Sequence, residues 1–177
     1  MKPQKKLFEQ VTILGVGLIG GSIGRILKKK RLCKQIIGVG RSVSNLRYAQ
    51  KHHIIDQFTS DLKRGTRNSD LVIVALPVKS IVPVIRKIAG FLPDGAIVTD
   101  VGSVKHSIVE KTEKYIPDRI HFVGGHPIAG TEKSGSAASF PELFMKRSCI
   151  LTPTEKTNKA ALNKVKRLWR SAGSKSA

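Results

Sequence analysis

Three glycines near the start of the chain constrain its fold more than any other feature. Gly15, Gly17 and Gly20 follow a short apolar run and open a stretch with helical periodicity. Glycines at this spacing allow a tight turn, a close approach of backbone to phosphate, and close packing of helix on strand. This context predicts a Rossmann-type dinucleotide-binding unit with the pyrophosphate at the helix N-terminus. Leu18 and Ile19, at the start of that helix, are included among the predicted cofactor-binding residues.

The rest of the chain alternates short apolar runs with amphipathic stretches. We expect strands at 11–14, 36–39, 71–76, 96–99, 120–123 and 149–151. We expect helices at 18–27, 43–52, 81–89, 103–114 and 158–172, with Pro83 in the first turn of its helix. This order predicts an α/β fold: one Rossmann-type domain over residues 1–177, with a doubly wound parallel sheet and right-handed crossovers.

The remaining bulk features exclude several classes of protein. A length of 177 residues suits one domain and is too short for two full ones. Cys33 and Cys149 both lie in apolar runs without metal-ligand spacing, so neither a disulfide framework nor a metal site is expected. The sequence shows no signal-peptide pattern and no apolar run of about 18 residues, so we expect a cytoplasmic protein without a membrane partner.

The charge of the chain is unusual. Its 32 Lys and Arg residues outnumber 12 Asp and Glu residues, which gives a formal net charge of +20. Such a field attracts polyanions, phosphorylated cofactors and small dianionic substrates alike. Aromatic residues make up only 5% of the chain and do not interleave with the basic clusters, as a base-stacking surface would require. We therefore expect a solvated basic surface and no nucleic-acid partner.

The end of the second predicted strand bears on the choice of cofactor. An acidic residue at this point would bind the 2′-hydroxyl of NAD. The sequence instead places Arg41 there, with Ser42 beside it and Arg47 one turn into the next helix. An arginine can accept a 2′-phosphate, so the sequence favours NADP. The alternative is that Arg41 only stacks on the adenine, in which case NAD is also accepted.

Two further polar clusters follow the fourth and fifth predicted strands. Asp100 and Ser103 belong to the first cluster, and His126 belongs to a glycine-rich segment in the second. Sites in doubly wound sheets lie beyond the carboxyl ends of the strands, so both clusters should open on the cleft of the glycine loop. A loop histidine can accept or share a proton near neutral pH. Ser103 also suits the N-cap of the helix that follows, and we assign no role to the other histidines.

Three strings together make the sequence resemble a known family. Motifs of the prephenate/arogenate dehydrogenases of tyrosine biosynthesis are similar to three strings found between Gly15 and Gly135, namely GVGLIGGS, TDVGSVK and GHPIAGTEKSG. The resemblance implies that His126 is the catalytic histidine and that Ser103 orients the substrate hydroxyl. It places Glu132 at the mouth of the substrate pocket. The predicted site residues with a substrate role are Thr131, Glu132 and Lys133, and those against the cofactor include Pro77, Val78 and Asp100.

The resemblance also implies an activity and a partner. The activity is NAD(P)-dependent oxidative decarboxylation of prephenate, or dehydrogenation of arogenate, and the sequence does not decide between these substrates. Members of the family usually continue into a helical C-terminal domain that dimerises and closes the active site, and we expect this domain to be absent from the chain. The alternatives are a truncated, non-catalytic nucleotide-binding module or half of a split enzyme. A homodimer or a separate chain with the missing domain is the expected partner.

Overall fold

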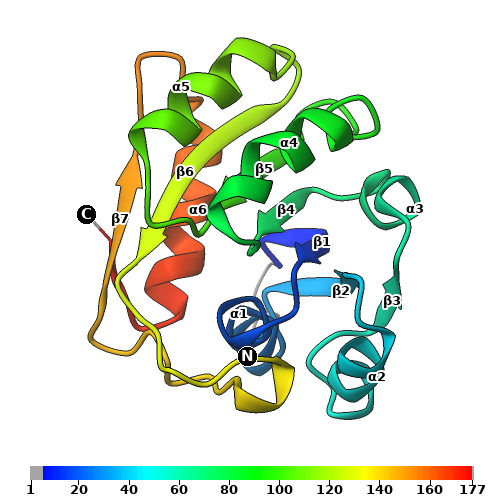
Figure 1. The fold of residues 1–177 in the computed structure, drawn as a ribbon. Coiled ribbons are helices and arrows are strands. Elements are labelled where there is room, and N and C mark those ends of the chain that lie inside the picture. Colours follow the sequence, from blue (N-terminus) through cyan, green and yellow to red (C-terminus); the bar gives the residue numbers. More distant parts are fainter. Residues whose placement is uncertain (1–5, 177) are drawn as a thin grey trace.

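A single sheet organises the protein, and the computed structural model describes it for residues 6–176 (Figure 1). The first five residues and Ala177 of the expected domain 1–177 lie outside the described residues. Within this range eight strands pair in the order β3-β2-β1-β4-β5-β6-β7-β8. The strands are β1 (Phe8–Leu14), β2 (Cys33–Val39), β3 (Gln57–Thr59), β4 (Leu71–Val74), β5 (Ile97–Asp100), β6 (His121–Pro127), β7 (Ser148–Thr152) and β8 (Lys175–Ser176).

Helices cover both faces of the sheet (Figure 1). They are α1 (Leu18–Lys29), α2 (Val43–Lys51), α3 (Leu62–Thr66), α4 (Val78–Ile88), α5 (His106–Tyr115), the 3₁₀ helix η1 (Ser136–Ala138) and α6 (Lys159–Ser171). Helices α1, α2 and α6 pack into one apolar core, and α4 and α5 pack into a second core across the sheet. From β3 to β6 all neighbours are parallel, and this strand order is that of a Rossmann fold. The predicted doubly wound α/β fold is confirmed.

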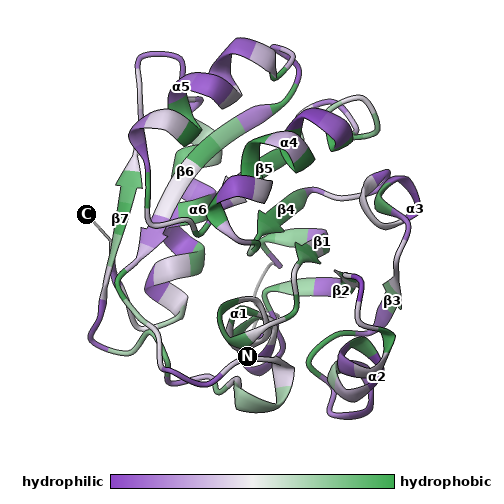
Figure 2. Ribbon diagram, viewed as in Figure 1, coloured by the Kyte–Doolittle hydropathy of each residue, from purple (hydrophilic) through white to green (hydrophobic). Residues whose placement is uncertain are grey.

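Burial on both faces explains why the central strands are so apolar. All four residues of β4 are 0% exposed, because α-helical layers cover them on each side. Figure 2 shows the same pattern, with hydrophobic colour along the central strands and hydrophilic colour on the outward faces of the helices. Burying a large aliphatic side chain contributes roughly 1.5–3 kcal/mol, so these strands and the helix faces packed on them stabilise the fold together. No helix in residues 6–176 has the length and apolar character to cross a membrane.

The predicted parallel sheet is confirmed from β3 to β6, whereas the last two strands, β7 and β8, run opposite to the others. Strand β7 runs antiparallel to β6, while β8 runs parallel to β7. A parallel partner needs a crossover, usually a helix, that carries the chain back to the other end of the sheet. The segment between β6 and β7 contains only the three-residue η1 and turns. The chain therefore enters β7 from the end at which it left β6.

Two predicted helices begin elsewhere. Helix α4 begins at Val78, because β4 ends at Val74 and Pro77 takes the N-cap position. Pro83 therefore lies inside the helix, whereas the sequence predicts it in the first turn. Helix α5 begins at His106 and not at 103. Four elements without a predicted counterpart, β3, α3, η1 and β8, are all five residues long or shorter.

Candidate functional site

Two cavities meet over the glycine loop at the carboxyl ends of the parallel strands. The first, here called the His126 cavity, has a volume of about 440 Å³, and Gly17, Ser103 and Lys133 also line it. The second, the Arg41 cavity, has a volume of about 880 Å³ and extends over β2 and α2. Four residues border both cavities, namely Gly17, Ala75, Leu76 and Pro77. The arrangement forms one elongated site with α1 pointing at its middle.

The glycines of the loop are there for different physical reasons. Gly15 has a φ of +90°, and a Cβ on it would lie 2.3 Å from the carbonyl oxygen of Ala75. At Gly20, a Cβ would lie 2.2 Å from the carbonyl oxygen of Gly15. These two glycines allow the turn and the close approach of α1. At Gly17 nothing lies within 4 Å of the Cβ position, so this glycine leaves open space at the junction of the cavities.

The N-terminus of α1 faces this junction and suits an anion. Gly17 occupies the N-cap position without a side-chain cap, and the first turn of α1 has no acidic residue. The first backbone N–H groups of a helix have no partner within the helix, and they carry a partial positive charge. Leu18, Ile19 and Gly20 all line the His126 cavity. The predicted phosphate cradle therefore has both the free donors and the space that it needs.

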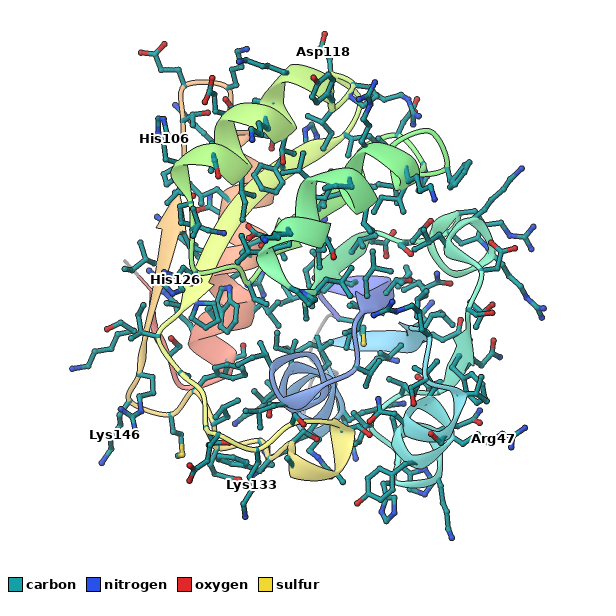
Figure 3. All side chains as sticks on the ribbon, viewed as in Figure 1. Arg47, His106, Asp118, His126, Lys133 and Lys146 are labelled. Carbon is teal, nitrogen blue, oxygen red and sulfur yellow. The ribbon has the colours of Figure 1, made fainter. Side chains whose placement is uncertain are left out.

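The Arg41 cavity holds the residues predicted to recognise the ribose. Arg41 and Ser42 both line it, and Arg41 is exposed. The Ser42 hydroxyl also caps α2, because it accepts a hydrogen bond of 3.3 Å from the backbone N–H of Asn45. Arg47 points away from the body of the protein (Figure 3), and it is not among the residues that line the cavity.

His126 lies on a strand, whereas the sequence predicts it in a loop. It belongs to β6, pairs with Ile150 of β7, and is partly buried. Figure 3 shows its ring inside the outline of the molecule, whereas the labelled His106 projects from the periphery. A side chain on a paired strand has a better defined position than one on a free loop, which suits a histidine that must meet a reacting group.

A buried ion pair holds the backbone just before His126. The Asp100 carboxylate pairs with Lys105 and accepts hydrogen bonds from the backbone N–H groups of Gly102 (2.9 Å) and Gly125 (3.2 Å). Lys105 in turn donates to the carbonyl oxygen of Gly125 at 2.8 Å. Both polar groups of Gly125 are thus fixed. Burial lowers the pKa of Lys105 from its usual value, and the charge of Asp100 opposes that shift.

The structure bears on two predictions next to this ion pair. Asp100 is 0% exposed and lines neither cavity, so its carboxylate is occupied inside the protein, and its role at the cofactor stays a prediction. Ser103 is not an N-cap, because the chain between Gly102 and Lys105 is held near β5 and α5 begins only at His106. Ser103 is instead exposed on the wall of the His126 cavity.

The segment after β6 borders the same cavity. Lys133, Ser134 and Gly135 line it, whereas the exposed Thr131 and Glu132 are not among its lining residues. The Thr131 hydroxyl accepts a 3.2 Å hydrogen bond from the N–H of Lys133. Of the predicted substrate residues, the structure thus brings Lys133 to the cavity and leaves the other two outside its wall.

Asn45 has several contacts to the site and is not among the predicted site residues. It lines the Arg41 cavity and hydrogen-bonds both the glycine loop and Ser136. Polar residues in the first turn of a helix are common, so the sequence carries no signal for these distant contacts. Pro77 lines both cavities and Val78 lines the His126 cavity, and their contact with the nicotinamide stays a prediction.

Comparison with known proteins supplies the family. The prephenate dehydrogenase nucleotide-binding domain matches residues 23–177. This chain belongs to the prephenate dehydrogenase family. The family membership agrees with the glycine loop, with the strand order and with the His126 string from which the resemblance was inferred.

Individual members of the prephenate dehydrogenase family match closely in sequence and in fold. Prephenate dehydrogenase of Bacillus subtilis is 37% identical over 161 residues, which are 90% of this chain and 43% of that protein. The crystal structure of prephenate dehydrogenase from Aquifex aeolicus with hydroxyphenyl propionate and NAD⁺ has a TM-score of 0.89 and 35% identity. It covers 100% of this chain and 60% of its own. The structure of Synechocystis arogenate dehydrogenase has a TM-score of 0.87 and 32% sequence identity, and the match covers 95% of this chain and 58% of that protein chain. The chain therefore spans roughly half the length of these relatives.

Proposed function

We propose that the chain binds a nicotinamide dinucleotide along the two joined cavities and presents His126 for the oxidation of prephenate or arogenate. The observation that carries the proposal is the shared cavity. It brings His126 and Ser103 to the same wall as the N-terminus of α1. The fit of the cofactor is supported by Gly17, where the open Cβ position leaves room for the pyrophosphate against the backbone.

The cofactor would be held by both cavities. The adenosine half would lie in the Arg41 cavity, and the nicotinamide half would lie against Pro77 and Val78 in the His126 cavity. Arg41 favours NADP, because its guanidinium can form charge-assisted hydrogen bonds with a 2′-phosphate. NAD remains the alternative cofactor, since the Aquifex aeolicus relative was crystallised with NAD⁺.

The chemistry of the site follows from the position of His126. When bound, the oxidised nicotinamide supplies the acceptor for the hydride that leaves the hydroxyl-bearing ring carbon of the substrate. His126 takes a share of the hydroxyl proton as the hydride leaves, and this makes the oxygen a better electron donor to the ring. With prephenate, the ring carboxylate departs as CO₂, its bonding electrons aromatise the ring, and His126 returns the proton to the phenol oxygen. Ser103 orients the hydroxyl from the cavity wall.

The surroundings of His126 support a site that is completed by further protein. Val104, Ile128 and Ile150 are 48%, 45% and 42% exposed. Ile150 is the direct partner of His126, so apolar surface extends from the cavity along the sheet. We propose that additional polypeptide, from a longer protein, a second copy or another chain, covers this surface in the active enzyme. Thr131 and Glu132, which are exposed beside it, would then meet the substrate from the mouth of the pocket.

An absorbance assay at the reduced-nicotinamide band tests the proposal. The purified chain is mixed with prephenate or arogenate and with NAD or NADP, and cofactor binding is titrated on the same sample. We expect saturable binding, tighter for NADP, and a loss of any turnover of about 10²-fold or more in His126→Asn. His106→Asn is the matched control, because His106 projects into solvent away from the cavities (Figure 3).

The outcomes separate the alternatives. Binding without turnover would favour the non-catalytic module or half of a split enzyme, and adding the remaining part of a relative would then restore activity in the second case only. Failure to bind either cofactor would contradict the proposal as a whole. Equal turnover in His126→Asn and in the unchanged chain would remove His126 from the mechanism.

A further inference from the structure

Asn45 connects two parts of the site that are far apart in the sequence. Its side-chain Nδ2 donates a 2.7 Å hydrogen bond to the carbonyl oxygen of Val16 in the glycine loop. Its Oδ1 accepts 2.8 Å hydrogen bonds from the backbone N–H and from the hydroxyl of Ser136. One amide group thus holds the glycine loop with its nitrogen and the segment after β6 with its oxygen.

The partners determine which way the amide points. A carbonyl oxygen can only accept and a backbone N–H can only donate, so only the orientation with Nδ2 toward Val16 satisfies both. The hydrogen bond to Ser42 also fixes the backbone of Asn45 at the start of α2. Aspartate has the same size but no donor for Val16, and alanine has neither group. Substitutions of Asn45 can therefore remove the hydrogen bond to Val16 alone, or the bonds to Val16 and Ser136 together.

Each half of the connection reaches a different cavity. The bond to Val16 fixes the peptide plane between Val16 and Gly17, because that peptide group is planar. Gly17 forms the junction of the cavities, and Asn45 itself lines the Arg41 cavity. The bond to Ser136 fixes the end of a segment whose preceding residues, Lys133 to Gly135, border the His126 cavity.

The segment also has anchors that do not involve Asn45. Arg25 donates a 3.0 Å hydrogen bond to the Ser139 hydroxyl, and the N–H of Phe140 donates to Ser22 at 3.1 Å. Ser136 is 0% exposed. Loss of the Asn45 side chain therefore leaves the end of the segment attached to α1, and the protein is expected to fold. What is lost is the direct link between the glycine loop and the cavity border.

We infer that Asn45 is a positioning residue that couples occupancy of the Arg41 cavity to ordering of residues 133–136 beside His126. The inference rests on the proposed binding of a nicotinamide dinucleotide. Filling the cavity holds the glycine loop, the loop holds the Asn45 amide, and the amide holds the border of the substrate cavity. Through this connection the cofactor prepares the surface that the substrate meets.

Three variants separate the two halves, with two readouts on each. The readouts are the dissociation constant for NADP and the hydrogen exchange of the residue 136 amide with and without NADP. Asn45→Asp removes the donor to Val16 and keeps the acceptor for Ser136, whereas Asn45→Ala removes both. Ser136→Ala keeps the backbone N–H bond and all contacts to the glycine loop. Asn163→Ala, at an exposed position on α6, is the matched control.

The expected pattern is selective. NADP binds about five- to tenfold more weakly to Asn45→Ala, which corresponds to one lost hydrogen bond. It binds more weakly still to Asn45→Asp, because the carboxylate also repels the Val16 carbonyl oxygen and the cofactor phosphates. Its affinity for Ser136→Ala and for the control changes less than about twofold, within the range of a neutral surface change. The residue 136 amide becomes more protected when NADP binds to the unchanged chain. This gain is lost in Asn45→Asp, although the amide keeps its acceptor, and a general loss of structure would not produce such a split.

The outcome also distinguishes the inference from the proposed function. If the unchanged chain binds NADP and Asn45→Asp keeps both the affinity and the gain in protection, the inference is overturned and the proposed function stands. If the unchanged chain binds neither NADP nor NAD, both fall together. A thermal melt of each variant shows whether a weakened affinity reflects partial unfolding, which would also count against the inference.

Discussion

Gly15 and Gly17 lie in the same loop but would respond differently to a methyl group. Gly15 has a positive φ, and its added Cβ would collide with the Ala75 carbonyl. We expect Gly15→Ala to lower the free energy of unfolding by about 2 kcal/mol or more, through strain and forced backbone movement. Gly17→Ala should cost about 1 kcal/mol, since its Cβ meets nothing and the N-cap changes only from glycine to alanine.

For cofactor affinity we expect Gly17→Ala to have the larger direct effect, although Gly15→Ala has the larger effect on stability. A methyl group at residue 17 projects into the junction of the cavities, so Gly17→Ala should weaken NADP binding while the chain stays folded. Chemical denaturation and a cofactor titration measure the two effects separately. Gly90→Ala is the control, because its Cβ position is open and lies outside both cavities. Unchanged affinity in Gly17→Ala would place the pyrophosphate elsewhere.

The two cysteines should be inert while the protein is folded. Burial raises the pKa of both Cys33 and Cys149 from 9.0 to about 12, so the nucleophilic thiolate is scarce at mildly alkaline pH. We expect a colorimetric thiol reagent to modify them only as fast as the protein opens, and at once in denaturant. Rapid modification of the folded protein would contradict this prediction.

The same pKa shifts predict the sign of a pH effect on stability. Between pH 9.0 and about 12 the unfolded state releases the thiol protons while the folded state retains them. The contribution of the thiols to stability is therefore complete below pH 9.0 and declines as the pH rises through this window. Replacing both cysteines by alanine should make the decline shallower, because the titrating groups are then absent.

The Asp100–Lys105 pair joins the carboxyl ends of strands β5 and β6, because both side chains also hydrogen-bond Gly125. Two variants test how much this connection contributes to stability. Lys105→Met would leave the buried Asp100 carboxylate without its cation, and removing one partner of a buried pair costs about 3–5 kcal/mol. The double variant Asp100→Asn with Lys105→Met should lose less than the single variant, since no buried charge remains. Denaturant unfolding measures both, and equal losses would show that the charge itself is unimportant.

The sequence pattern predicted those elements whose signal is local. Strand β4 is a continuous apolar run, and the glycine loop carries its own backbone requirements, so both could be placed in advance. Strand β3, with the sequence QFT, is too short and polar to show a period. The direction of β7 depends on where the preceding segment travels, which apolar residues do not encode.

The candidate site shows the same division between local and distant information. Motifs at strand ends predict that His126, Ser103 and Lys133 lie near one cleft, because parallel strands bring their carboxyl ends together. All three residues line the His126 cavity. Asn45 and the buried state of Asp100 could not be found in this way. The bonds from Asp100 to Gly125 and from Asn45 to Val16 and Ser136 join residues 25 to 91 positions apart, and only the folded chain brings these partners together.

For the molecule as a whole, the dominant electrostatic feature is its excess of positive charge. Acidic residues number 12 against 32 basic residues, so most cations have no acidic residue to pair with. Several ion pairs that do form are exposed, such as Lys34 with Glu9, and exposed pairs contribute about 0–1 kcal/mol. Folding therefore concentrates unpaired like charges on a compact surface, which destabilises the folded state through self-repulsion.

Added salt should consequently stabilise this protein. Ions screen exposed charges over about 10 Å at moderate ionic strength, and here the repulsions that they screen outnumber the attractions. We expect the melting temperature to rise with sodium chloride concentration, in a thermal scan without cofactor. A variant with Lys164→Gln and Arg167→Gln, both at exposed positions of α6, should start from a higher melting temperature and respond less steeply. A melting temperature that falls with salt would mean that the few ion pairs outweigh the net charge, and the variant would then be the less stable protein.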